Sequence, residues 1–334
     1  MALADTQGAA QALADYLGVS PDSVGDFAVD SAYSLADLGV YSRAEAWALL
    51  ASLTLKDDDS FSALAYVLSK EGEKERALEF YRRAVELDSS ATNLYNLAYI
   101  YDELGDYESA KRLYKLALKK TPSDETIHLN LGNAFWNLGD VRGAEAHYRE
   151  ALRLNPRYYN AAFNLALAYR ERGYYEPALH YALEAYSLDS SDYDIYMLIA
   201  GLYESLEDYG KEAAVLRRAW ERFPDSAQVG YYLARAYRMA GDTEKAFRAY
   251  REVIERFPRF AEAYAGMAEL LGEGVSSDES DSWDLGSLSF GATKKWGAGI
   301  SYDSRYFQET VYREELVVMD IPAVESYAWW GFYG

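Results

Sequence analysis

Apolar residues recur along most of the chain at intervals of three and four residues, the spacing that places them on one face of a helix. Three successive stretches, residues 93–122, 127–156 and 161–190, align with one another without gaps. A glycine near the middle of each stretch predicts a turn between two helices, because glycine adopts the left-handed backbone of a helix end at little cost. The pattern predicts helix–turn–helix units that repeat about every 34 residues.

Small, aromatic and turn residues keep the same place in each of these units. The residues that share a register are Leu97, Leu131 and Leu165; Tyr101, Phe135 and Tyr169; Gly105, Gly139 and Gly173; and Ala110, Ala144 and Ala178. This combination resembles the tetratricopeptide repeat (TPR) family. The resemblance implies an all-α fold, an α-α superhelix in which each helix pair packs on its neighbours.

The register of the repeats divides the chain into four parts. They are a leading helix in 1–24, a repeat array over 25–274, an acidic linker at 275–282 and an aromatic-rich tail over 283–334. The array itself comprises a degenerate repeat at 25–57, six full repeats over 58–260 and a capping helix at 261–274.

The fifth full repeat departs from the pattern. Glu207 stands where the turn glycine is expected, and Glu212 stands where the other repeats have a small residue. Either the turn is rearranged at this point or the superhelix changes its pitch.

The tail differs in composition from the repeats. It is rich in Gly, Tyr and Trp, and the stretches SLSF, GISY and ETVY alternate polar and apolar residues in the manner of short strands. The predicted fold is therefore an all-α superhelix with a short C-terminal extension that could contain strands. Three roles stay open for the tail: docking in the groove of its own array, binding a partner, or completing an oligomer.

Composition and charge narrow the class of function. The chain of 334 residues has a net charge of −21 and no cysteine. The acidic balance argues against a nucleic-acid partner, and the lack of cysteine excludes disulfides and thiolate metal sites. No apolar stretch approaches the length of a membrane span, and residues 1–19 do not resemble a secretion signal, so we expect a cytoplasmic protein.

The sequence offers no constellation that suggests an enzyme. It lacks phosphate-binding glycine loops and the common hydrolase and metalloprotease motifs. Its histidines, His128, His147 and His180, have no histidine or carboxylate partner at the spacing of metal ligands. We therefore expect a non-enzymatic protein with no cofactor and no metal.

The TPR resemblance implies that the first helix of each repeat lines a concave groove where extended peptides or partner helices bind. Asn96, Asn130 and Asn164 occupy the sixth position of three successive repeats, on the side opposite the packed stripe. An amide offers a donor and an acceptor, which suits the backbone of an extended peptide. This ladder resembles the one in the repeat domain of O-linked N-acetylglucosamine transferase. Alternatively, the amides bond between neighbouring first helices and stiffen the stack.

Further groove candidates are mostly aromatic and arginine side chains, which carry much of the energy at protein interfaces. They are Tyr95, Tyr99, Asn133, Trp136, Arg170, Arg235 and Arg238. The leading hypothesis is a scaffold or adaptor that binds a protein or peptide partner in this groove. One alternative is a chaperone, because residues 20–72 resemble the translocator chaperones of type III secretion. The other is a structural protein that self-associates through its tail.

Overall fold

The computed structural model of the chain describes residues 8, 11–16, 18–272, 288–293 and 297–302, the two strand segments by their backbone alone. The chain forms two compact units, Met1–Gly173 and Tyr174–Gly334, which we call the first and the second unit. The predicted linker at 275–282 and residues 303–334 of the predicted tail lie outside the described residues.

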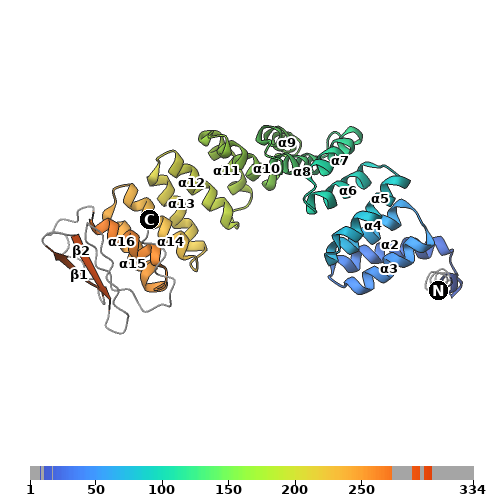
Figure 1. Ribbon diagram of the computed structural model, residues 1–334, viewed down its shortest axis with the longest axis horizontal. Helices are drawn as coiled ribbons and strands as arrows, with labels where there is room; N and C mark the ends of the chain where they lie inside the picture. Colours follow the sequence, from blue (N-terminus) through green and yellow to red (C-terminus); the bar gives the residue numbers. More distant parts are fainter. Residues whose placement is uncertain (1–7, 9–10, 17, 273–287, 294–296, 303–334) are drawn as a thin grey trace. The chain divides into compact units, whose positions relative to one another are not determined.

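Within each unit, consecutive helices lie side by side (Figure 1). The helices of the first unit are α2 (Pro21–Asp37), α3 (Tyr41–Thr54), α4 (Asp58–Glu71), α5 (Lys74–Leu87), α6 (Ala91–Glu103), α7 (Tyr107–Lys120), α8 (Glu125–Asn137), α9 (Val141–Leu154) and α10 (Tyr159–Glu171). Those of the second unit are α11 (Tyr175–Leu188), α12 (Tyr193–Ser205), α13 (Tyr209–Arg222), α14 (Ala227–Met239), α15 (Thr243–Arg256) and α16 (Ala261–Gly272). This stacking of helix pairs confirms the predicted all-α repeat fold.

Two strands follow α16 in the C-terminal extension. Strands β1 (Leu288–Thr293) and β2 (Gly297–Tyr302) pair antiparallel, with Leu288 opposite Tyr302. They include the last three residues of the SLSF stretch and all of the GISY stretch, which have the alternation of strands. In the part of the chain that the structure describes, no helix combines the length and the apolar character needed to cross a bilayer.

The turns between paired helices share one backbone arrangement, a residue in the left-handed conformation. Gly139 has a φ of 77°, and the backbone N–H groups of Gly139 and Asp140 donate to the carbonyls of Trp136 and Phe135, each over 2.9 Å. These bonds satisfy carbonyls that the end of α8 would leave unpaired. The Asp140 carboxylate then accepts a hydrogen bond from the backbone N–H of Gly143 at 2.9 Å and caps α9.

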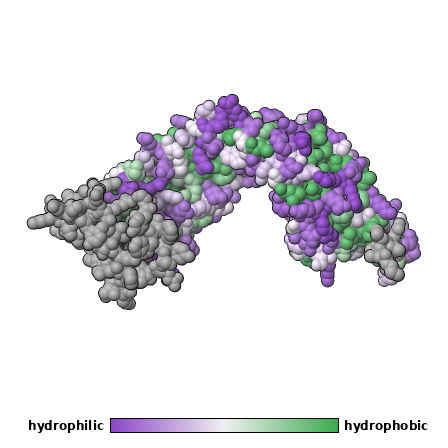
Figure 2. Space-filling view, viewed as in Figure 1, coloured by the Kyte–Doolittle hydropathy of each residue, from purple (hydrophilic) through white to green (hydrophobic). Residues whose placement is uncertain are grey.

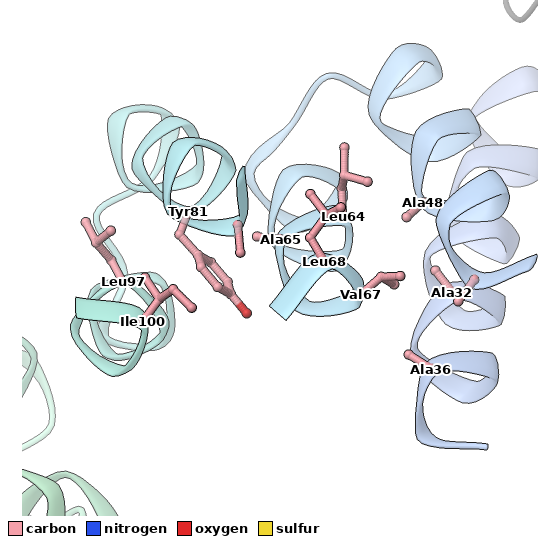
Figure 3. Close-up of a cluster of buried hydrophobic side chains, with 12 residues drawn as sticks. Ala32, Ala36, Ala48, Leu64, Ala65, Val67, Leu68, Tyr81, Leu97 and Ile100 are labelled. Atoms are coloured by element: carbon pink, nitrogen blue, oxygen red, sulfur yellow. The ribbon is translucent and has the colours of Figure 1, made fainter. Parts of the chain in front are cut away.

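A buried tyrosine from the second helix of a repeat fills the space between first helices. Tyr81 of α5 points between α4 and α6, toward Leu68 and Ile100 (Figure 3). Tyr114 and Tyr148 take the same place in the next two repeats and are 0% and 2% exposed. A large ring fits there only where the facing helix carries a small residue, which accounts for the repeated alanine and glycine.

The turn of the fifth full repeat is not rearranged. Glu207 adopts the left-handed conformation of the turn glycines, with a φ of 57°. The backbone N–H of Asp208 still donates to the carbonyl of Tyr203 at 2.9 Å, as in the glycine-containing turns. The repeat keeps its turn although an L-residue in this conformation costs roughly 1 kcal/mol. Of the two expectations for this turn, local rearrangement is therefore wrong.

Substitution of Gly132 can test how closely the Tyr148 ring packs against α8. A Cβ atom at this position would lie 2.5 Å from Cε1 of Tyr148. We predict that Gly132→Ala lowers the free energy of unfolding by roughly 1–3 kcal/mol, because the ring must shift in a packed core. Gly201→Ala is the matched control, since a Cβ on that helical glycine meets no atom within 4 Å. The control should be neutral or stabilising in urea unfolding; an equal loss in both variants would contradict the packing argument.

Candidate functional site

Several predicted groove residues are joined by hydrogen bonds in the first unit. Asn130 donates through Nδ2 to the Tyr95 hydroxyl at 2.9 Å, and Asn133 donates to Oδ1 of Asn130 at 3.5 Å. Asn164 donates to Oδ1 of Asn133 at 3.0 Å, and that oxygen also accepts from the Tyr148 hydroxyl at 2.9 Å. We call these five residues the amide network. It connects α6, α8, α9 and α10.

The network shows how the predicted asparagine ladder is used inside the protein. Asn130 and Asn164 bond between repeats, as the stiffening alternative requires. Both side chains are half-buried, so they keep some contact with solvent. Asn96 is also half-buried and is not part of the amide network. Binding of a peptide backbone by these amides stays a prediction.

A pocket of 240 Å³ lies beside the amide network. Its lining residues are Asp102, Asn133, Trp136, Asn137, Tyr148, Asn164 and Leu167. They come from α6, α8, α9 and α10, so the pocket is formed within the first unit. Its volume falls below the range of about 300–1,000 Å³ that is usual for pockets that bind drug-sized molecules. A single side chain is therefore a better match for it than a small-molecule ligand.

Asp102 and Tyr148 were missed by the sequence analysis. Asp102 is the twelfth residue of its repeat, in register with Trp136 and Arg170, and this register could have identified it. Tyr148 was less accessible to sequence reasoning, because the ring belongs to a second helix and its position in the core predicts packing alone. Its hydroxyl nevertheless reaches the amide network.

Asp102 has an unusual electrostatic environment. Burial raises the pKa of its carboxyl group to about 6, and the neighbouring charge of Glu103 adds to the effect. Its Oδ1 atom is buried and has no hydrogen-bond partner among the residues that the structure describes. Burial disfavours the charged form of a carboxyl group, and a missing donor leaves that penalty uncompensated.

Exposed aromatic and basic groups lie on the same first helices. Tyr99 is 43% exposed, and its ring centroid lies 6.5 Å from that of Tyr95 in a stacked arrangement. Trp136 is half-buried at the pocket wall, and Arg170 is exposed on α10. Figure 2 shows that hydrophobic residues reach the surface in separate patches among hydrophilic ones. A face of this composition can contact both the backbone and the side chains of another polypeptide.

Arg235 and Arg238, the remaining predicted site residues, belong to the second unit and are engaged in ion pairs. Arg235 pairs with Glu204 and lies 5.2 Å from the centroid of the Tyr232 ring. Arg238 pairs with Glu269 at 2.8 Å, and its side chain is 16% exposed. These contacts fix both guanidinium groups at the surface of α14.

Glu212 is buried at the position where other repeats place alanine. It is 3% exposed, and burial raises its pKa to about 7, with a smaller contribution from the charge of Glu204 and an opposing one from Arg235. The equivalent Ala144 and Ala178 are fully buried. The carboxyl group of Glu212 is thus held where the fold favours a small apolar side chain.

Two of the histidines meet in the structure, a contact that the sequence analysis did not identify. The Nδ1 atoms of His128 and His147 lie 3.1 Å apart, and His128 also contacts the Pro122 carbonyl through Nε2 at 3.1 Å. The two residues face each other because they lie on paired helices of one repeat, a relation that linear spacing does not reveal. Within the described ranges, no three His, Cys, Asp or Glu side chains converge as metal ligands.

Family models described as tetratricopeptide repeat match residues 62–125, 95–159, 129–192 and 228–259. No curated protein matches the chain. The chain therefore contains tetratricopeptide repeats, as its resemblance to this family implied. Folds of this class generally mediate protein–protein interactions and are generally non-catalytic scaffolds.

Solved structures with the same fold share little sequence with the chain. The C-terminal part of a TPR repeat-containing protein from Cytophaga hutchinsonii is 16% identical with a TM-score of 0.61, over 72% of this chain and 99% of that one. PilF of Pseudomonas aeruginosa is 23% identical with a TM-score of 0.57, over 64% and 98%. A tetratricopeptide repeat protein from Parabacteroides merdae is 18% identical with a TM-score of 0.52, over 74% and 98%. The resemblances to the transferase ladder and to secretion chaperones remain predictions.

The raised pKa of Glu212 predicts that the stability of the protein depends on pH. Its pKa is about 7 in the folded protein against an ordinary value of 4.5, so its burial is tolerated fully below about pH 4.5 and costs stability as the pH rises to 7. We predict that Glu212→Ala raises the melting temperature more at pH 8 than at pH 4.5. The matched control is Glu221→Ala, an exposed position on the same helix, which should behave like the wild type at both values.

The lowered pKa of His147 predicts the opposite effect, a loss of stability as the pH falls. Burial, with His128 and Lys115 nearby, lowers the pKa of His147 from 6.5 to about 4. The neutral ring thus stabilises the fold above pH 6.5, and this contribution is lost as the pH falls toward 4. His147→Gln should flatten the decline of melting temperature between pH 7 and 5. The exposed His180→Gln is the control and should follow the wild type; identical curves for all three proteins would exclude His147 as the cause.

Proposed function

We propose that the chain is a scaffold that binds an extended peptide or a helix of a partner protein across the first helices α6, α8 and α10. The observation that supports this proposal is the pocket beside the amide network, whose wall includes Trp136. We call the surface formed by these three helices the first-helix face.

The amide network favours binding by reducing its entropic cost. Side chains that are already held by hydrogen bonds lose less freedom when a partner arrives. Asn130 and Asn133 are fixed in this way, yet both remain half-buried rather than sealed from solvent. A second pocket of 240 Å³, lined in part by Tyr95, Thr121 and Asp124, adjoins α6 and the start of α8. Both pockets are lined by residues of α6 and α8, so two different side chains of one partner segment could occupy them.

Aromatic side chains supply the apolar part of the proposed contact. Trp and Tyr are enriched among the residues that dominate interface energies, because they bury a large area with few rotatable bonds. Tyr99 and Trp136 stand on consecutive first helices, and Arg170 follows on the next. Because the net charge of the chain is −21, electrostatic steering favours a partner segment that is neutral or basic.

The test begins with an unbiased peptide display library selected on the full-length chain. Selected peptides are synthesised, and their affinity is measured by fluorescence anisotropy. We predict that the combined change Tyr99→Ala and Trp136→Ala weakens binding by tenfold or more, on the order of 2 kcal/mol, because it removes two aromatic contacts. Circular dichroism checks that helical content is unchanged.

The matched control is Leu116→Ala. Leu116 and Tyr99 are both 43% exposed, but Leu116 lies on the second helix α7, outside the first-helix face. Affinity should be unchanged in this variant. A library that yields no peptide, or peptides that bind the double variant as well as the wild type, would refute the proposed function. Light scattering over a concentration series separates this scaffold from the self-assembling alternative.

A further inference from the structure

One wall of the pocket carries a carboxylate without a partner. Oδ1 of Asp102 is buried and accepts no hydrogen bond from any residue in the described part of the chain. Buried polar atoms in folded proteins are almost always paired, so such an oxygen requires an explanation. Its position at the pocket wall makes a bound group the natural candidate.

The surrounding side chains do not supply what Asp102 lacks. The other lining residues are uncharged: Asn133, Trp136, Asn137, Tyr148, Asn164 and Leu167. The Tyr148 hydroxyl donates to Asn133 at 2.9 Å and is therefore engaged elsewhere. Glu103, the charged group that acts on Asp102, is itself negative and pairs with Lys74 of α5 at 2.7 Å. The missing element is a hydrogen-bond donor, and a positively charged one would also neutralise the carboxylate.

We propose that the pocket binds the basic side chain, a lysine or an arginine, of the peptide that lies across the first-helix face. The inference rests on the proposed function, since the basic group is part of that peptide. The Asp102 carboxylate provides the counter-charge and the acceptor for the incoming N–H groups. Trp136 provides an indole at the pocket wall, the ring that cations contact most favourably.

The pocket volume agrees with this ligand. A space of 240 Å³ holds one long side chain and excludes a whole peptide segment. A neutral side chain of the same length would leave the carboxylate unpaired, whereas an acidic one would add a like charge. The pocket therefore selects for charge as well as for size.

The titration of Asp102 gives the site a dependence on pH. The ionisable groups around it are Glu103 and Tyr99 on α6, Tyr114 on α7 and Tyr148 on α9, while α8 and α10 present neutral side chains to the pocket. The pKa values of the three tyrosines are raised, so none of them titrates between pH 5 and 8. With a pKa of about 6, Asp102 is ionised at pH 8 and about nine-tenths protonated at pH 5.

The experiment uses the full-length chain and the peptides selected for the proposed function. In each peptide, every Lys or Arg is replaced in turn by norleucine, which keeps an unbranched four-carbon side chain and removes the charge. We expect one replacement to weaken binding to the wild type by about tenfold, the effect of a lost charged hydrogen bond. In Asp102→Asn the same replacement should cost less than about twofold, because the two changes are coupled.

Two further measurements separate a binding role from a structural one. Wild-type affinity for the unmodified peptide should fall about tenfold between pH 8 and pH 5, whereas Asp102→Asn should be much less sensitive. Asp102→Asn should also raise the melting temperature at pH 8, because it removes a buried charge. Glu86→Gln, an equal charge change at an exposed position of α5, is the control and should leave peptide selectivity unaltered.

The outcomes distinguish the two proposals. Peptides that depend on Tyr99 and Trp136 but contain no basic residue would overturn the cation site and leave the scaffold standing. Equal norleucine costs in the wild type and in Asp102→Asn would have the same consequence. Since the pH comparison can be made on the wild type alone, a poorly folded Asp102→Asn would still leave the inference open to refutation.

Discussion

The fit between one large ring and one small residue governs the structure. Tyr81, Tyr114 and Tyr148 are inserted from second helices, and alanine or glycine on the facing first helix leaves room for them. Because protein interiors are close-packed, this pairing fixes how near the helices approach and therefore where each neighbouring repeat begins. The packing also determines the surface, because the residues that point away from these tyrosine contacts are exposed to solvent or to a partner.

The fold could be predicted because it depends on residues that recur. Periodic apolar positions and turn glycines identify the helix pairs, and the family models match the same stretches. Glu207 shows why even the irregular repeat keeps its turn: the strain of one residue is smaller than the loss of the hydrogen bonds that end α12. The turn therefore does not strictly require glycine at this position.

The candidate site was only partly predictable, because it depends on contacts between repeats. The asparagines were recognised from their register, but their hydrogen bonds to Tyr95 and Asn133 depend on the rotation of each repeat against the next. The register of Asp102 with Trp136 and Arg170 marks its position, but its burial and its missing donor are visible only in the folded chain. His128 and His147 meet because paired helices bring distant positions together. Such contacts between helices can be identified only from the three-dimensional structure.

The twelfth position of the first helices has a broader consequence. Asp102, Trp136 and Arg170 occupy it in three successive repeats, so an acid, an aromatic ring and a base follow one another along a scaffold whose packing residues barely change. Under the proposed function, the side chains at this position would contact the ligand, and none of the three is a ring of the packed core. Exchanging one amino acid at this position could redirect the protein to a different ligand while its architecture stays intact, which makes such arrays ready material for evolutionary diversification and for engineered specificity.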